Sequence, residues 1–83
     1  MQHRAHQQIA LVNGERVPLP GLWTYRGWRI ERWRRRGWMV IPPGDLHPSD
    51  EHRTLGAAKR SIDRFLEEYP DLYRPDLAED ELK

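Results

Sequence analysis

Arginine and tryptophan are concentrated in one short stretch of the chain, WRIERWRRRGW, from Trp28 to Trp38. These eleven residues hold five arginines and three of the four tryptophans of the 83-residue sequence. Guanidinium groups neutralise phosphates and contact guanine with two hydrogen bonds, and an exposed aromatic ring can stack on a base. The chemistry indicated is binding to nucleic acid, or to a protein surface, where arginine and tryptophan often dominate the binding energy.

The candidate binding site consists of the arginines of this region and the tryptophan between them. Its residues are Arg26, Arg29, Arg32, Trp33, Arg34, Arg35 and Arg36. The alternative is that the same arginines form a solvated hairpin tip or pair with acidic residues of the C-terminal part. The use of arginine without lysine is more selective than an ordinary soluble face, because the guanidinium fork matches phosphate geometry.

Basic and acidic charges are separated along the chain. Residues 26 to 36 carry six arginines and one acid, a net charge of +5, whereas residues 63 to 83 carry eight acids and three bases, a net charge of −5. The overall net charge is only +1. This distribution is compatible with binding a polyanion, with docking on a protein, or with pairing of the two segments. An acidic end can also compete with a ligand for the arginines.

Other kinds of site find little support in the sequence. The chain has no cysteine, no phosphate-binding glycine loop and no GxSxG motif, so we predict no enzymatic activity and no small-molecule substrate. The four histidines lack the helical spacing of a zinc site, and we expect no metal or other cofactor. No segment approaches the ~20 apolar residues of a membrane span, and no signal peptide is evident, which predicts a cytoplasmic protein without a membrane partner.

Two β-hairpins are expected to position these residues. The first covers residues 9–19, where Asn13-Gly14 is the favoured pair for a two-residue turn. Pro18 cannot donate to a ladder, so the second strand is expected to lie at a sheet edge or to be short. The motif PLPG then breaks the chain. The second hairpin has strands near residues 25–33 and 38–41. A short extended segment around His52-Arg53 completes a three-stranded meander.

The length of the second loop decides which side chains share a face of the sheet. A three-residue loop, Arg35-Arg36-Gly37, uses glycine at the positive-φ position and leaves Trp33 on the face away from the helix. A two- or four-residue loop reverses the second strand. We favour the three-residue loop because it aligns the larger apolar set. That set is Trp28, Ile30, Trp38 and Val40, and Met39 and Ile41 then lie on the far face with Trp33.

The far face of the sheet needs a cover or stays open. The favoured cover is the first hairpin, through Ile9, Leu11, Val17 and Leu19. The alternative is a partly exposed Trp33 that contacts a partner. Exposure of Trp33 together with the arginines is therefore the observation that separates a scaffold from a binding surface.

An amphipathic helix is predicted from Leu55 to about Tyr69. Thr54 is a good N-cap, Pro70 prevents continuation, and apolar residues recur at helical spacing. The predicted fold class is α+β: a small antiparallel sheet, made of the N-terminal hairpin and the three-stranded meander, packed against one C-terminal amphipathic helix.

One domain is expected, over residues 9–69. Residues 1–8 are predicted to form a flexible N-terminus, and residues 70–83 an acidic, mobile tail.

Three segments between Tyr25 and Leu66 resemble known proteins: YRGWRI, RGWMVIP and RTLGAAKRSIDRFL. In this order they resemble small phage and mobile-element proteins. In outline they are similar to the sheet-plus-helix DNA-binding domains of integrase arms and plant ethylene-response factors. The resemblance covers about half of the chain. It implies that the sheet enters the major groove, with Arg26, Arg29 and Arg32 as contacts and Trp33 as a further candidate.

The resulting expectation is a small, non-enzymatic, phage-type accessory protein that binds nucleic acid through its arginine- and tryptophan-rich hairpin, in the cytoplasm of a host cell. The alternative is a protein-binding inhibitor of a host nucleic-acid machine that uses the same basic surface. Small phage proteins of this size include such inhibitors, the anti-CRISPR proteins. The expected partner is therefore nucleic acid, or an acidic or nucleic-acid-handling protein.

Overall fold

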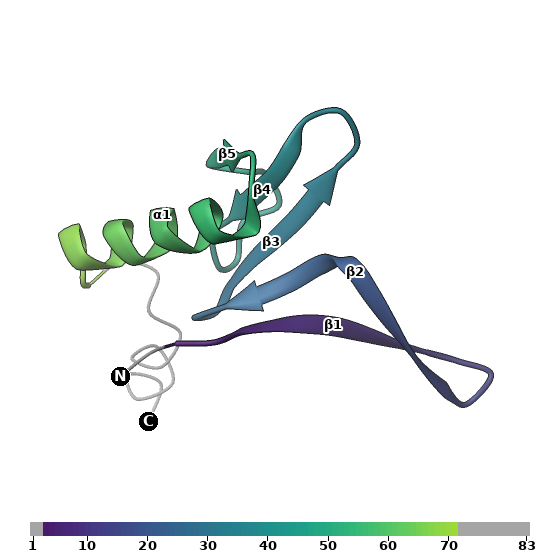
Figure 1. The fold of residues 1–83 in the computed structure, drawn as a ribbon. Helices are drawn as coiled ribbons and strands as arrows, with labels where there is room; N and C mark the ends of the chain where they lie inside the picture. Colours follow the sequence, from purple (N-terminus) through teal and green to yellow (C-terminus); the bar gives the residue numbers. More distant parts are fainter. Residues whose placement is uncertain (1–2, 72–83) are drawn as a thin grey trace, which may run out of the picture.

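The sheet has five antiparallel strands in the order of the sequence. The computed structural model describes residues 3–71 of the chain. Its elements are β1 (Ala5–Val12), β2 (Glu15–Tyr25), β3 (Trp28–Trp33), β4 (Gly37–Ile41), β5 (Asp50–His52) and α1 (Leu55–Glu68). Each strand pairs with the next, and α1 packs against β3, β4 and β5 (Figure 1). The predicted α+β class is confirmed. Residues 5–8, which the sequence placed in a flexible N-terminus, belong to β1.

Strand β2 continues from the first hairpin into the main sheet. The expected two-residue turn is present, with φ values of 52° at Asn13 and 82° at Gly14. The motif PLPG, which was expected to break the chain, lies inside β2. The pairing register steps between Gln7 and Gln8, where three residues of β2, from Pro20 to Leu22, are left over. Such an insertion bends a strand without ending it.

The first hairpin extends sideways as an arm, which we define as β1 together with residues 15–20. Figure 1 shows the arm projecting away from α1. Ile9, Leu11 and Val17, expected to cover the far face of the sheet, are 54%, 74% and 38% exposed. That prediction was wrong, because β2 passes through its bend and carries the hairpin outwards.

A second two-residue turn joins β2 to β3. Arg26 and Gly27 have φ values of 52° and 86°, and Tyr25 pairs with Trp28 across them. Arg26 was expected inside a strand, because asparagine or aspartate is the usual first residue of such a turn. Arg26 therefore lies at the opposite end of β3 from the arginine-rich loop.

The loop between β3 and β4 is formed by Arg34–Arg36. Trp33 pairs with Gly37, and the amide of Arg36 donates to the carbonyl of Trp33 at 3.2 Å. Arg35, with φ of 64°, occupies the left-handed position of a type II turn. The predicted loop was one residue later and gave this role to glycine. The observed pairing of β3 with β4 is shifted by two residues from the predicted pairing. Side chains alternate between the two faces of a strand, so a shift of two leaves each side chain of β3 and β4 on its predicted face.

Gly37 permits the close approach of β5 to β4. A Cβ atom at this position would lie 2.6 Å from the carbonyl oxygen of His52, and the φ of Gly37 is 128°. A larger residue would push the two strands apart.

The main core lies between α1 and the sheet. It contains Tyr25, Trp28, Ile30, Val40, Ala58, Ile62 and Leu66. Ile30 and Val40 are direct cross-strand partners, and they lie on the same face of the sheet, as predicted. Met39 and Ile41 are also buried, although they lie on the opposite face. Asp45, in the segment between β4 and β5, lies near that face, because its carbonyl accepts a hydrogen bond from Arg29.

Helix α1 begins and ends close to the predicted residues. The side chain of Thr54 accepts a hydrogen bond from the amide of Ala57 at 3.0 Å, a cap that stabilises helices by about 1 kcal/mol. The helix ends one residue before Tyr69, which is followed by Pro70. Beyond Asp71, the predicted acidic tail lies outside the described residues.

Candidate functional site

Arg26 is engaged in the scaffold. Its Nη1 atom lies 2.9 Å from Oδ1 of Asp63 on α1, and the hydroxyl of Tyr25 donates to the same carboxylate at 2.8 Å. Burial raises the pKa of Tyr25 to about 12; the hydrogen bond and negative charge of Asp63 act in the same direction, and Arg26 opposes them. This cluster ties the β2–β3 turn to α1, so Arg26 lies apart from the arginine-rich loop.

Arg29 also has partners within the fold. Its Nη2 atom donates to the carbonyl of Asp45 at 3.2 Å, and its Nη1 atom lies 3.9 Å from Glu31. Because Arg29 pairs with Ile41 on the face away from α1, the first contact holds the segment after β4 against that face. The guanidinium of Arg29 is therefore engaged within the fold and lies apart from the arginine-rich loop.

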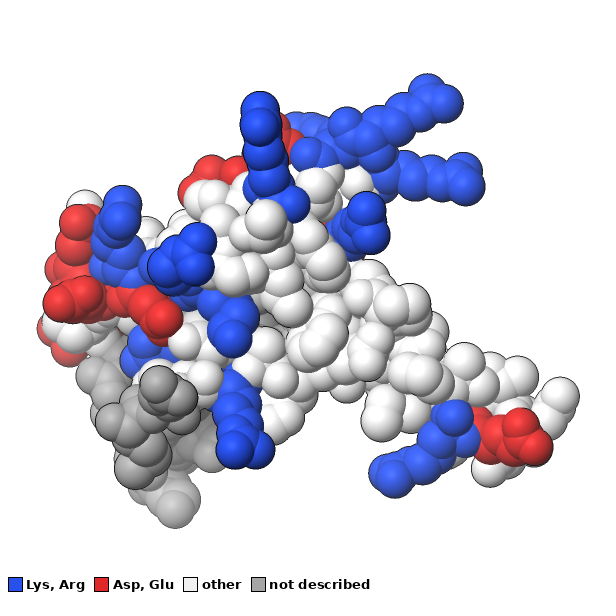
Figure 2. Space-filling model, in the orientation of Figure 1, with Lys and Arg blue, Asp and Glu red and all other residues white. Residues whose placement is uncertain are grey.

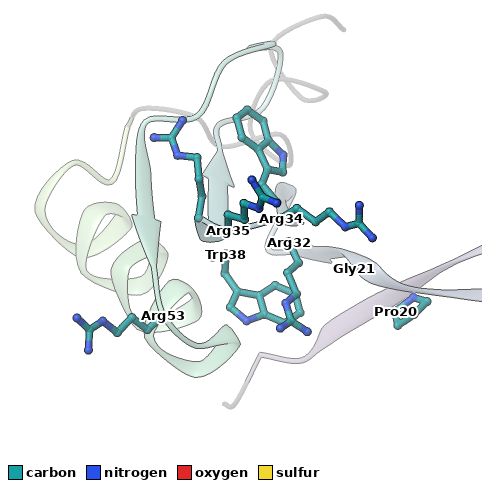
Figure 3. Close-up of a pocket in the computed structure, with 10 residues that line it drawn as sticks. Pro20, Gly21, Arg32, Arg34, Arg35, Trp38 and Arg53 are labelled. Atoms are coloured by element: carbon teal, nitrogen blue, oxygen red, sulfur yellow. The ribbon is translucent and has the colours of Figure 1, made fainter.

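The other four arginines of the predicted site gather at the end of the β3–β4 hairpin. They line an open hollow of about 580 Å³ together with Arg53 and two tryptophans. Figure 3 shows that these side chains come from β3, the loop, β4 and the segment after β5. We call this set the arginine tip: Arg32, Trp33, Arg34, Arg35, Arg36, Trp38 and Arg53.

Sequence reasoning missed Arg53. The residue follows β5, whose last residue, His52, pairs with Trp38, so Arg53 is placed beside Gly37 at the start of β4. The sequence feature that could have indicated Arg53 is the short extended segment around residue 52. When this segment pairs with the second strand of the hairpin, the residue that follows it, Arg53, lies next to the loop.

Each tryptophan of the tip is paired with an arginine, one pair on each face of the hairpin. The guanidinium of Arg32 lies 5.9 Å from the ring centre of Trp38, on the face that carries α1. The guanidinium of Arg36 lies 5.8 Å from the ring centre of Trp33, on the far face. Trp33 Nε1 donates to Glu31 at 3.1 Å, which fixes the ring. Both tryptophans are half-buried.

The tip holds an excess of positive charge. Arg36 forms an exposed ion pair with Glu51 at 3.2 Å. Arg34, Arg35 and Arg53 are exposed, and among residues 3–71 their side chains make no ion pair or hydrogen bond. Five arginines and Glu51 give the tip a local net charge of +4. In Figure 2, basic side chains project from this end of the molecule, while acidic side chains gather at the C-terminal end of α1.

The arginines of this arrangement can bind anions, and its two tryptophans can contact the aromatic rings of a ligand. In the part of the chain that the structure describes, no three histidine, aspartate or glutamate side chains come together as a metal site. No helix within residues 3–71 is long and apolar enough to cross a membrane.

Fold and tip together define a small α+β protein with a basic hairpin end. Comparison with models of known families, with curated proteins and with solved structures gives no significant match. The resemblance to integrase-arm and ethylene-response-factor domains therefore depends on sequence motifs alone. Its suggested contacts are separated in the structure, since only Arg32 and Trp33 lie in the tip.

Proposed function

We propose that the protein is a non-enzymatic, phage-type accessory protein that binds nucleic acid through the arginine tip. The observation that supports this most is the meeting of Arg34, Arg35 and Arg53 at one projecting end without an acidic partner among residues 3–71. Grouping like charges is unfavourable in the free protein. Phosphates relieve the repulsion and release counterions when they bind.

The end of the hairpin, rather than the flat face of the sheet, is the contacting part in this proposal. One face of the sheet is covered by α1, and Met39 and Ile41 are buried on the other. The loop at residues 34–36 is exposed and carries the charge. A two-stranded ribbon is narrow enough to enter a major groove, which is about 12 Å wide in B-form DNA.

Two kinds of contact are available at the tip. Arg34 and Arg35 are free to reach phosphates, which gives affinity without sequence preference. The stacked pairs, Arg36 on Trp33 and Arg32 on Trp38, present a cation beside an aromatic ring on either face of the ribbon. Such pairs suit contact with bases at a groove edge or in a single strand.

Charge reversal at the loop tests the proposal. We expect Arg34→Glu and Arg35→Glu each to weaken binding to duplex DNA by about tenfold at low salt, because each removes a cation from a phosphate and introduces repulsion. The salt dependence, as log Kd against log salt, should become shallower by about 0.9 for each phosphate that is no longer neutralised. Fluorescence anisotropy with labelled duplex and single-stranded DNA measures both quantities.

The matched control is Arg16→Glu, which makes the same charge change at an exposed site on the arm. Arg16→Glu should retain most of the affinity. The absence of a complex with any nucleic acid at micromolar protein and low salt would reject the proposal. A partner protein recovered from nuclease-treated lysate, and absent when Arg34→Glu is used as bait, would then support the protein-inhibitor alternative.

A further inference from the structure

Strand β1 forms an open edge of the sheet. It pairs only with β2, so the outer side of its backbone has no strand partner within the described residues. From Ala5 to Val12 the strand contains no lysine, arginine, aspartate, glutamate or proline. Soluble proteins usually protect a long edge with charges or proline, because an open edge accepts a strand from another chain. β1 has neither form of protection.

The other edge of the arm is protected. A two-residue turn makes Val12 and Glu15 a hydrogen-bonded pair, and the pairs alternate from there. Pro18, opposite Ile9, therefore sits in a non-hydrogen-bonded pair, and its missing N–H faces the outer edge of β2. Pro20 follows two positions later on a part of β2 that β3 does not reach. Proline blocks that edge and leaves β1 as the open one.

The same alternation determines what β1 offers to an incoming strand. Ile9 and Leu11 lie in non-hydrogen-bonded pairs with β2, so their N–H and C=O groups point to the open edge. Their side chains are 54% and 74% exposed, and that of Val12 is 50% exposed. An added strand would form ladder hydrogen bonds with Ile9 and Leu11 and cover part of their apolar surface.

We propose that this strand is β1 of a second copy of the chain, paired antiparallel about a two-fold axis. An antiparallel pair is symmetric, so β1 can satisfy its own open edge in a dimer. The strand carries no carboxylate, ammonium or guanidinium group, and two copies meet without like-charge repulsion. A nucleic acid finds no cation on this edge. The two sheets then continue into one sheet of ten strands, five from each copy.

The dimer leaves the arginine tips free, because no tip residue belongs to β1. If the tips bind nucleic acid, two of them on one particle increase the apparent affinity for a long duplex. The dimer itself is independent of that function.

Sedimentation equilibrium of the full chain without nucleic acid tests the dimer. Edge pairing buries less area than a standard interface, so we expect a micromolar affinity and a mass that rises to twice that of the chain by about 100 µM. Leu11→Lys adds a charge at the open edge in both copies and should raise the dimer dissociation constant at least about tenfold. Val17→Lys is the control, since it adds the same charge to β2 of the arm and should leave the dimer intact.

Leu11→Pro is a second variant, which removes an outward N–H and no β1–β2 hydrogen bond, and it should also yield monomers. Circular dichroism checks that each variant folds. A wild-type chain that stays monomeric over the whole series would overturn the proposal. So would a dimer that both folded Leu11 variants retain, or equal effects of Leu11→Lys and Val17→Lys. None of these results bears on nucleic-acid binding, which is measured separately.

Discussion

Asp63 joins three parts of the fold through one carboxylate. The hydroxyl of Tyr25 lies 2.8 and 2.9 Å from its two oxygens, and Arg26 Nη1 lies 2.9 Å from one of them. Arg26 has a left-handed φ of 52°, which is unfavourable for a residue with a Cβ atom. Its ion pair with Asp63 offsets part of that cost, which explains why an arginine can occupy this turn.

The titration of Tyr25 follows from these contacts. We predict ionisation at a pKa of about 12, against 10.0 for an ordinary tyrosine. The folded state holds this proton more tightly than the unfolded chain does. The resulting stabilisation is therefore complete below pH 10 and is lost as the pH rises to about 12. Ultraviolet absorbance titration and pH-dependent unfolding measure the two effects.

Two substitutions should shift this pKa in opposite directions. Asp63→Asn lowers it, because the negative charge that opposes the phenolate is removed, whereas Arg26→Gln raises it. Tyr25→Phe is the control, and should remove the late absorbance step. Shifts of the same sign in Asp63→Asn and Arg26→Gln, or ionisation of Tyr25 together with the other tyrosines, would contradict the assignment.

At the level of single residues, the sequence correctly predicted that arginines and a tryptophan of the second hairpin lie together, but not every residue that belongs to the group. Arg32, Trp33 and Arg34–Arg36 were placed together correctly because they are adjacent in one hairpin. Arg26 was misplaced because it lies beyond a turn that its residue type does not favour. Arg53 was missed because its position depends on the pairing of β5 with β4, a contact between distant residues.

Among the elements, the β3–β4 turn combines charge with backbone strain. Arg35 has φ of 64°, where glycine fits without cost, whereas Arg34 has no positive φ. We predict that Arg35→Gly raises the free energy of unfolding by about 1 kcal/mol, and that Arg34→Gly lowers it slightly because the chain becomes less stiff. Thermal or denaturant unfolding measures the difference.

The two glycine variants are matched in charge, since each removes one exposed arginine from the same loop. Both should therefore show a similar decrease in affinity for nucleic acid, although their stabilities move apart. A variant that is more stable but binds less would show that arginine at position 35 costs stability and contributes to binding. Equal stability changes would mean that the left-handed backbone at Arg35 carries no strain.

Element boundaries were predictable where local chemistry determines them. The cap at Thr54, the apolar period of α1 and the Asn13-Gly14 turn each depend on neighbouring residues, and all three are confirmed. The sequence PLPG looked like a break because proline and glycine favour turns. In the fold, β1 pairs on both sides of the register step, and this non-local pairing keeps β2 continuous. No local pattern contains that information.

On the scale of the whole molecule, three ends carry different chemistry. The arginine tip is basic. Strand β1 of the arm has no acidic residue, lysine or arginine and exposes apolar side chains. Acidic side chains gather at the C-terminal end of α1 (Figure 2). Because these ends are separate, the two proposals are compatible: a polyanion at the tip would not obstruct a second copy at the arm. The sequence predicted the basic and acidic parts from charge alone. It did not predict the arm, because that needs the path of β2.

The acidic C-terminal residues should compete with nucleic acid for the arginine tip. Glu79→Gln combined with Glu81→Gln raises the net charge from +1 to +3. We expect affinity for duplex DNA to rise about threefold at low salt, and the gain to vanish at about 1 M salt, where the screening length falls to about 3 Å.

The matched control is Glu67→Gln combined with Glu68→Gln, which makes the same change of net charge on exposed positions of α1. These two positions lie on α1, away from the tip, and their neutralisation acts through the overall field of the molecule. Competition by the C-terminal residues therefore requires a larger gain for the Glu79 and Glu81 pair, measured as anisotropy across a salt series. Equal gains in affinity for the two double variants would mean that only the net charge of the protein matters. The prediction of competition by the acidic C-terminal residues would then be wrong.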